Sequence, residues 1–432
     1  MNTEDKIIEW LRASHSPFHA IALMEEQLRQ AGYQKLDEKG DFPFEAGGKY
    51  YVVRNMSSLL AFRLPEKAAS PSFAISASHS DSPSFKVKPN PVFESNGITM
   101  LNVEPYGGMI MSSWMDRPLS LAGRVSVLDR QGHLANRLFD VDEDLLLMPN
   151  VCIHFNREVN RGYAWNPAND TIPMLGQLGP DFDFPAFLAQ RLQLKDGEEV
   201  AGFDLFLYNR EAPRLVGLRK EFLAAERLDN LTSAFTCLLG LLASDKSGNV
   251  DVLAVFDNEE VGSLTKQGAN STFLKDTLTR IASFYRADYE QAIANSFLLS
   301  VDNAHANHPN HPEYFDKTTH VALNGGIVIK YNANQKYTSD GYSAAILKAL
   351  AKKAQVKVQE YTNRSDLPGG STLGNISNAE VSLNAVDIGL SQLAMHSCYE
   401  VMGKDDLQAM ADLLCAFYGC TLRFAGEEAT ID

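Results

Sequence analysis

A strand-like apolar run ends in three carboxylates within four residues in the stretch Val252-Leu-Ala-Val-Phe-Asp257-Asn-Glu259-Glu260-Val-Gly262-Ser263. Adjacent acidic side chains repel each other, and moving them out of water at the mouth of a buried strand costs free energy. A bound cation would offset both effects. The stretch therefore predicts a metal site at the end of a strand, and metal catalysis is the first functional hypothesis.

The length and composition of the chain indicate a folded globular protein. It has 432 residues, of which 45% are hydrophobic and 22% charged, and this length favours two domains that each bury a sizeable core. The formal net charge of −15 comes without a cluster of Lys and Arg, which disfavours nucleic acid and anionic membranes as partners. A small molecule or a peptide is the favoured ligand.

The cysteines and the first residues indicate where the protein works. The five cysteines are odd in number and lack CxxC spacing, which argues against a disulfide framework and against a thiolate zinc site. Residues 1–10 contain acidic side chains and no long apolar core, so we expect neither a secretory signal nor a membrane span. We therefore expect a cytoplasmic protein with reduced thiols.

The two ends of the chain show the alternation of helix and strand that is typical of an α/β fold. Apolar residues at helical spacing predict two opening helices at 4–14 and 18–31, with Thr3 as the N-cap of the first and Gly32 ending the second. The further predicted elements are strands at 73–79, 251–256, 296–301, 356–361 and 380–388 and helices at 230–243, 343–354 and 405–423.

Residues 90–215 differ from the rest of the chain in their pattern of apolar residues, Pro and Gly. Runs such as Gly123-Arg-Val-Ser-Val-Leu128 alternate or stay apolar over strand lengths, Pro and Gly recur, and no long amphipathic helix is evident. We therefore predict a β-rich domain at residues 90–215, inserted into a catalytic domain that is made of residues 1–89 and 216–432.

Several possible metal ligands follow predicted strands or open a helix. Each has a plainer explanation when taken alone: a hydrogen-bonded structural role for His79, a helix cap for Asp229 and a turn for Asp302. In open α/β sheets, however, ligands gather beyond the carboxyl ends of strands. As a set, oxygen and imidazole donors without cysteine suit zinc, manganese or cobalt. The candidates are His79, Asp229, Glu259, Glu260, Asp302 and His396.

Seven segments carry a resemblance to a known family. They are Ser78-His-Ser-Asp-Ser-Pro83, Val103-Glu-Pro-Tyr-Gly-Gly108, Arg227-Leu-Asp-Asn230, Asp257-Asn-Glu-Glu-Val-Gly-Ser263, Asp302-Asn-Ala-His305, Gly370-Ser-Thr372 and Leu393-Ala-Met-His396. The chain resembles the aspartyl aminopeptidase family of dinuclear zinc metallopeptidases over nearly its whole length. The resemblance implies a zinc-exopeptidase-like mixed sheet flanked by helices and interrupted by an inserted β-rich dimerisation domain.

The resemblance also implies two zinc ions per subunit and a role for each candidate. The implied ligands are Asp229 as the bridge, His79 and Asp302 at one ion, and Glu260 and His396 at the other. Glu259 is then the general base, which takes a proton from a water whose pKa zinc lowers to roughly 7 and returns it to the leaving amine. Asp81 resembles the carboxylate that orients the imidazole of His79.

Substrate and assembly follow from the same resemblance. His305 and Lys330 occupy positions like those that recognise an acidic N-terminal residue, and Asp366 with the turn 368–372 would line the cleft. His154 matches a residue that completes a neighbouring subunit's site, and family members assemble into twelve-subunit shells that favour short peptides. An exposed lysine at a strand end and a packed histidine on a strand are the plainer explanations for Lys330 and His154.

Alternative functions and metals stay open. The chain would also suit a related metal-dependent amidohydrolase or deacetylase, or a non-catalytic shell-forming binding protein, although the intact Glu259 argues against the latter. Manganese or cobalt would suit the same ligands as zinc. Met109, Met115 and Leu264 depart from the family pattern. Nearby, His308 and His311 lie among Pro and Asn, which favours a surface loop over a second metal site.

Overall fold

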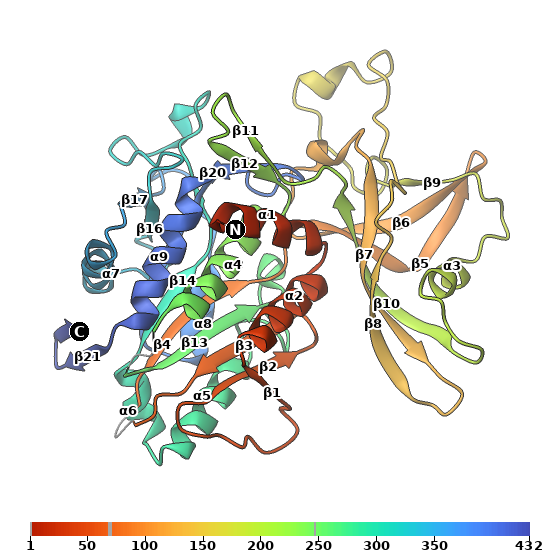
Figure 1. The fold of residues 1–432 in the computed structure, drawn as a ribbon. Helices are drawn as coiled ribbons and strands as arrows, with labels where there is room; N and C mark the ends of the chain where they lie inside the picture. Colours follow the sequence, from red (N-terminus) through yellow and green to blue (C-terminus); the bar gives the residue numbers. More distant parts are fainter. Residues whose placement is uncertain (1, 68–70, 246–247) are drawn as a thin grey trace.

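A nine-stranded mixed sheet forms the centre of the computed structural model, which describes residues 2–67, 71–245 and 248–432 (Figure 1). Its strands, in order across the sheet, are β1 (Gln34–Leu36), β2 (Lys49–Arg54), β3 (Ser58–Arg63), β13 (Val250–Phe256), β4 (Phe73–His79), β14 (Phe297–Val301), β18 (Asn384–Gly389), β16 (Ile327–Tyr331) and β17 (Val358–Thr362).

The four central strands β13, β4, β14 and β18 run parallel to one another. Every residue of β13, β4 and β14 is buried, which explains why these strands read as continuous apolar runs rather than as alternating ones. Phe256 pairs with His79, and Val301 pairs with Ile388, so the strands end at the same edge of the sheet. The segments that follow these strands are thereby brought together.

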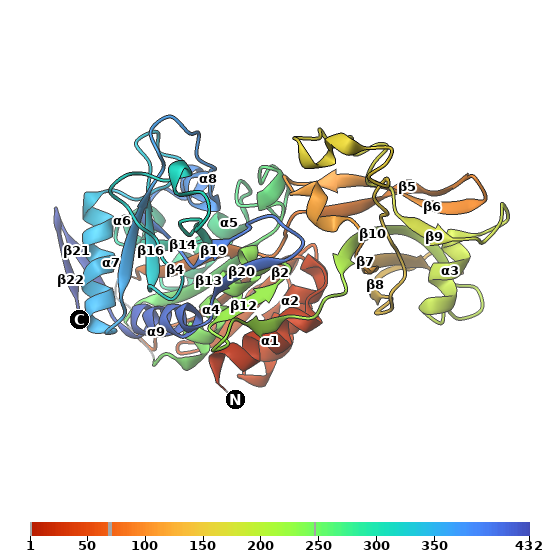
Figure 2. The ribbon, with the colours of Figure 1, turned by 90° about the horizontal axis from the view of Figure 1, so that it is seen from above.

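Helices cover both faces of the sheet, as Figure 2 shows for α4 and α9 on one side and α5 and α8 on the other. Along β13, Leu253 and Val255 belong to one core and Val252 and Ala254 to the other, as the two-residue period of a strand requires. The helices of the first face are α1 (Thr3–Ala13), α2 (Pro17–Gln30), α4 (Leu228–Ala243), α7 (Gly341–Lys353) and α9 (Asp405–Gly419). Those of the second face are α5 (Phe273–Phe284), α6 (Tyr289–Ala294) and α8 (Leu373–Glu380).

A second, six-stranded sheet lies beside this body in both views (Figures 1 and 2). In order, its strands are β8 (Leu134–Asp140), β7 (Leu119–Leu128), β10 (Glu199–Asn209), β5 (Ser84–Ser95), β6 (Ile98–Tyr106) and β9 (Met174–Gly176). With α3 (Phe184–Arg191) it packs around a third apolar core. The prediction that this region is rich in β-strands is confirmed, and the domain boundaries at residues 89 and 215 stay a prediction.

Two smaller sheets complete the fold. A five-stranded sheet orders β11 (Arg214–Val216), β12 (Phe222–Ala225), β20 (Glu400–Gly403), β19 (Ser391–Leu393) and β15 (Ala304–His305). A hairpin joins β21 (Leu422–Ala425) to β22 (Glu428–Ile431). No helix within the described ranges is long and apolar enough to cross a membrane.

Several predicted element ends are wrong by a few residues. Asn2, not Thr3, caps α1, because its side chain accepts the backbone N–H of Asp5. Helix α8 ends at Glu380, the first residue of the strand expected at 380–388, and β18 begins only at Asn384. The helix expected at 405–423 ends at Gly419, and the hairpin strand β21 begins at Leu422. The predicted α/β class, a mixed sheet flanked by helices, is confirmed.

Candidate metal centre

Six of the predicted site residues meet at the edge where the parallel strands end. Their ligand-capable atoms form three overlapping groups, and within each group these atoms lie within 4.8 Å of one another. The groups are His79 with Asp229 and Asp302, His79 with Glu259 and Glu260, and Asp229 with Glu260 and His396. Because Asp229 belongs to the first and third groups, it joins the two ends of the cluster.

Asp229 lies between two histidines in the first turn of α4. Its Oδ1 is 3.7 Å from Nε2 of His79, and its Oδ2 is 3.6 Å from Nε2 of His396. The residue is buried, and Oδ1 has no hydrogen-bond partner in the part of the chain that the structure describes. Such an oxygen is costly unless a cation or a donor satisfies it, so the site fits a metal. The backbone of α4 is kinked at Asp229 and Asn230, and no backbone N–H among the described residues donates to the carboxylate of Asp229, so the helix-cap explanation is wrong.

Both histidines turn the same ring nitrogen toward the cluster. Nδ1 of His79 donates to the carbonyl oxygen of Asp81 at 3.0 Å, and Nδ1 of His396 donates to the carbonyl oxygen of Gly108 at 2.6 Å. A carbonyl oxygen only accepts, so Nδ1 carries the proton and the lone pair of the neutral ring lies on Nε2. This is the arrangement that metal-ligating histidines usually have.

The carboxylate of Asp81 holds the turn that carries the two adjacent glutamates. It accepts the backbone N–H groups of Glu259 and Glu260 at 3.1 and 3.2 Å, and it accepts the hydroxyl of Tyr106 at 2.7 Å. Asn258 adopts a left-handed conformation (φ 61°) at the start of this turn, and its side-chain amide donates to the same hydroxyl. The carboxylate of Asp81 therefore positions Glu259 and Glu260, whereas its backbone carbonyl accepts the bond from the imidazole of His79.

Burial shapes the protonation of the cluster. It raises the pKa of Glu259 to about 8 and that of Asp302 to about 6, and neighbouring carboxylates add to both shifts. Burial lowers the pKa of His396, but the carboxylates of Asp229 and Glu260 outweigh it and raise that pKa to about 10. Carboxylates crowded in this way favour any positive partner, whether a proton or a metal ion.

Comparison with known proteins identifies the family. The sequence model described as aminopeptidase I zinc metalloprotease (M18) matches residues 10–418. The chain belongs to the M18 family. A probable M18 family aminopeptidase 2 of Pseudomonas aeruginosa (strain UCBPP-PA14) is 41% identical over 418 residues, which cover 95% of this chain and 97% of the relative. The predicted family is confirmed, and the M18 chain is a metal-dependent aminopeptidase.

Solved structures share the M18 fold. A chain in the cryo-EM structure of the Ape4 and Nbr1 complex is 33% identical, with a TM-score of 0.92 and coverage of 96% of this chain and 85% of that one. The S. cerevisiae mApe1 dodecamer has the same fold, with a TM-score of 0.85, 24% identity and coverage of 96% of each chain.

Two buried acids of this M18 chain lie close to the ligand cluster without joining it. Asp257, the first acid after strand β13, belongs to none of the metal-binding groups among the described residues. Burial raises its pKa to about 7, with the nearby Asp81 carboxylate as the next cause. Glu400 accepts the backbone N–H groups of Asp229 and His396, and the sequence analysis missed it. Its position four residues after His396 is the only signal in the sequence.

The two predicted acid-recognising residues lie next to the M18 cluster. Lys330 is buried, and its Nζ donates to the carbonyl oxygens of Asp302 (2.7 Å) and Asn303 (3.3 Å). Its explanation as an exposed lysine is therefore wrong. His305 is partly buried, and its ring lies 5.9 Å from that of Tyr361. Burial and the charge of Lys330 lower the pKa of His305.

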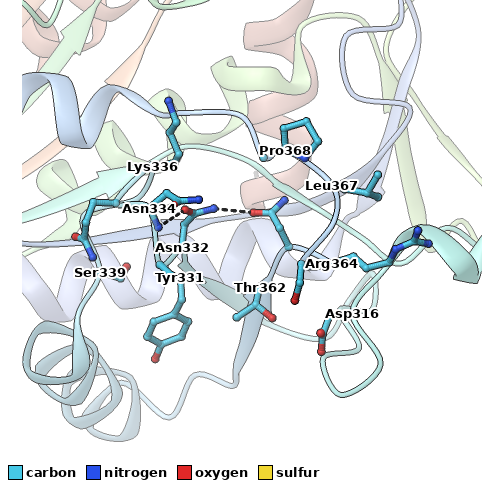
Figure 3. A pocket seen from close by; sticks show the side chains of 15 residues that line it. Asp316, Tyr331, Asn332, Asn334, Lys336, Ser339, Thr362, Arg364, Leu367 and Pro368 are labelled. Carbon is cyan, nitrogen blue, oxygen red and sulfur yellow. Dashed lines mark hydrogen bonds between the residues drawn. The ribbon is translucent and has the colours of Figure 1, made fainter.

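The other two predicted substrate residues lie outside the cluster. His154 is exposed on a turn, which excludes the packed histidine on a strand. Asp366 is also exposed and forms an ion pair with Arg364 at 2.6 Å, which lowers the pKa of Asp366 to about 2. A nearby cavity of about 610 Å³ is lined by Asp316, residues 331–336, Ser339 and residues 362–365 and 367–369 rather than by the cluster. Figure 3 shows these side chains.

The possible metal-binding groups among the described residues include neither His308 nor His311. The rings of His308 and His311 lie 5.1 Å apart, and Nδ1 of His311 contacts the carboxylate of Glu313 at 2.9 Å. His311 and Glu313 are both largely exposed, as expected for a surface loop.

Proposed function

We propose that this M18 chain is a dinuclear zinc aminopeptidase that removes an acidic residue from the N-terminus of short peptides. The observation that carries the proposal is the buried carboxylate of Asp229, whose two oxygens face different histidines and one of which has no partner among the described residues. A carboxylate that bridges two cations requires this placement.

The donors around Asp229 fit two zinc ions. Asp229 would bridge the ions, with His79 and Asp302 at one of them and Glu260 and His396 at the other. Zinc takes imidazole nitrogens and carboxylate oxygens in catalytic sites, and manganese or cobalt would suit the same donors. When bound, zinc lowers the pKa of a water to roughly 7 and polarises the carbonyl of the scissile peptide bond.

Glu259 would move the proton of the reaction. Its side chain is 12% exposed, against 5% for Glu260, so it is the more open of the two neighbouring acids. Asp81 fixes the backbone of both residues. Bound cations would lower the raised pKa of Glu259, so that its carboxylate could take a proton from the attacking water and deliver it to the leaving amine. Asp81 acts on this step only by positioning.

A preference for an acidic N-terminal residue is supported by Lys330 and His305. The ammonium of Lys330 is a buried cation next to the cluster, and its hydrogen bonds to two carbonyl oxygens hold it at the edge where Asp302 lies. A substrate carboxylate would gain a charge-assisted hydrogen bond there. His305 would contact the same group, and Asp366 would act at the outer edge of the cleft.

The region around His154 supports assembly into a homo-oligomer. Val151, Ile153 and Phe155 flank His154 and are 53%, 48% and 86% exposed. Apolar side chains this exposed are typical of a surface that another subunit covers. We propose that residues 90–215 form the dimerisation domain, that His154 reaches a neighbouring site, and that dimers assemble into a cytoplasmic dodecamer like that of mApe1.

Metal analysis of the purified protein together with an N-terminal residue panel tests the proposal. Two zinc ions per chain and release of free Asp and Glu from dipeptides, faster than release of Leu, are expected. Hydrolysis of acyl amides without release of an N-terminal amino acid would instead favour an amidohydrolase. Zinc-loaded protein that cleaves no substrate would favour a binding protein.

A further inference from the structure

We propose that Glu400 is a positioning residue that fixes two metal ligands, Asp229 and His396, through their backbones. The inference rests on the proposed dinuclear function and adds a residue to it. Glu400 opens β20, which pairs with β12 and β19, so its own backbone is anchored in the five-stranded sheet. Its side chain is 2% exposed.

The carboxylate of Glu400 joins two loops that are 167 residues apart in the chain. Its Oε2 accepts the backbone N–H of Asp229 at 3.1 Å, and its Oε1 accepts the backbone N–H of His396 at 2.7 Å. Each oxygen is thus occupied by a donor that belongs to a proposed ligand. Because the bonds are to backbone groups, they set where each ligand side chain begins and leave its polar atoms free for metal.

A chain of buried amides extends this link to the third ligand loop. The side-chain amide of Gln392 donates to Oε1 of Glu400 at 3.2 Å and accepts from the amide of Asn303 at 2.8 Å. Asn303 directly follows Asp302 and also donates to the carbonyl oxygen of Leu228, next to Asp229. Glu400 therefore stands at the end of a network that reaches the loops of Asp229, Asp302 and His396.

The loop of His396 needs such support. Ala394 and His396 both have left-handed backbones, with φ of 54° and 67°. Residues with a Cβ disfavour this conformation, so it persists only where the surroundings hold it. The bond from the N–H of His396 to Glu400 and the bond from its Nδ1 to Gly108 fix the backbone and the ring at the same time.

The chemistry requires a carboxylate at position 400. Two N–H donors approach its two oxygens, and glutamine has the same shape but offers one oxygen and one NH₂ group. Glu400→Gln would set a donor against either Asp229 N–H or His396 N–H. Glu400 itself belongs to no metal-binding group among the described residues. It acts through the ligands and does not join them.

Zinc affinity of the full-length protein, measured by competition with a chromophoric chelator, tests the inference. Loss of a group that orients a ligand typically costs about 10–100-fold in metal affinity, and we expect that loss in Glu400→Gln. Asp406→Asn is the matched control, because Asp406 is a buried carboxylate whose oxygens accept two backbone N–H groups, those of Asn324 and Gly326. Neither Asn324 nor Gly326 is a proposed ligand, so the zinc affinity of Asp406→Asn should stay within about threefold of that of the wild type.

The outcomes separate the inference from the proposed function. Wild-type affinity in Glu400→Gln, or an equal loss in Asp406→Asn, overturns the positioning role. A wild-type chain that binds fewer than two zinc ions overturns the dinuclear function itself. If Glu400→Gln does not fold, Gln392→Leu removes only the amide link and is expected to weaken zinc binding about 10-fold. Unchanged affinity in that variant counts against the inference.

Discussion

Replacing Glu259 by glutamine should separate catalysis from metal binding in this M18 chain. Glu259 is not one of the five proposed ligands. Its Oε2 lies 4.0 Å from Nε2 of His79, whereas the carboxylate oxygens of Asp229, Glu260 and Asp302 lie 3.4 to 3.9 Å from Nε2 of His79 or His396. Glutamine keeps the shape and the backbone bond to Asp81 but cannot take a proton at neutral pH. We therefore expect full zinc content with lost turnover.

The expected size follows from general-base catalysis. Proton transfer by a positioned side chain contributes about 10²–10⁴-fold, so kcat should fall by that factor, or about 2.7–5.4 kcal/mol in activation free energy. Steady-state hydrolysis of an N-terminal Asp dipeptide is measured beside zinc content. Glu260→Gln is the matched control at the next residue, and it should lose zinc because Glu260 is a proposed ligand together with His396, whose Nε2 lies 3.4 Å from its carboxylate. Glu259→Gln with full zinc and more than a tenth of wild-type kcat would refute the assignment.

Three further changes test the ligands, the selectivity and the stability of the chain. Asp229→Asn should leave at most one zinc ion per chain by metal analysis, since it removes the charge shared by both halves of the cluster, and two retained ions would contradict the bridging role. Lys330→Met should lower kcat/KM on Asp and Glu substrates at least about tenfold more than on Leu substrates; an equal loss on all three would argue for a structural role. Burial lowers the pKa of His19 from 6.5 to about 4. As the pH falls from 6.5 towards 4, the unfolded chain takes up a proton that the folded chain does not, so the free energy of unfolding decreases over this range. In urea unfolding, this residue should make the free energy of unfolding about 2 kcal/mol lower at pH 5 than at pH 7, and His19→Gln should remove that difference. An unchanged pH dependence in the variant would contradict this role of His19.

The sequence predicted the centre of the fold better than its edges. Strands β4, β13 and β14 are buried on both faces, and their uninterrupted apolar residues make them visible without an alignment. Helix α8 was missed because it buries only Leu373, Gly374 and Ser377 and so shows no apolar stripe. Helix α5 does carry apolar residues at helical spacing, so its signal was present and was overlooked.

Most candidate ligands could be found because they stand where a predicted strand ends or a predicted helix begins, and His396 lies in the loop after the strand predicted to end at residue 388. The residues that hold them could not be found in this way. Asp81 was noticed only through the family resemblance, and its bonds to the turn of Glu259 and Glu260 run to backbone groups, which leave no mark on the sequence. The same holds for Glu400, whose two partners are the backbones of Asp229 and His396.

Asp81 and Glu400 divide the support of the cluster between them. Asp81 fixes the turn of Glu259 and Glu260 and lies against His79, while Glu400 fixes Asp229 and His396. Each carboxylate binds backbone N–H groups, and these persist whatever side chain the ligand position carries. A ligand substitution therefore removes a donor from the metal without releasing its loop. A change at Glu400 instead moves two ligands at once, and a change at Asp81 moves one ligand, Glu260, together with the general base Glu259. This asymmetry explains why the supporting carboxylates should affect metal affinity through geometry although neither one binds metal.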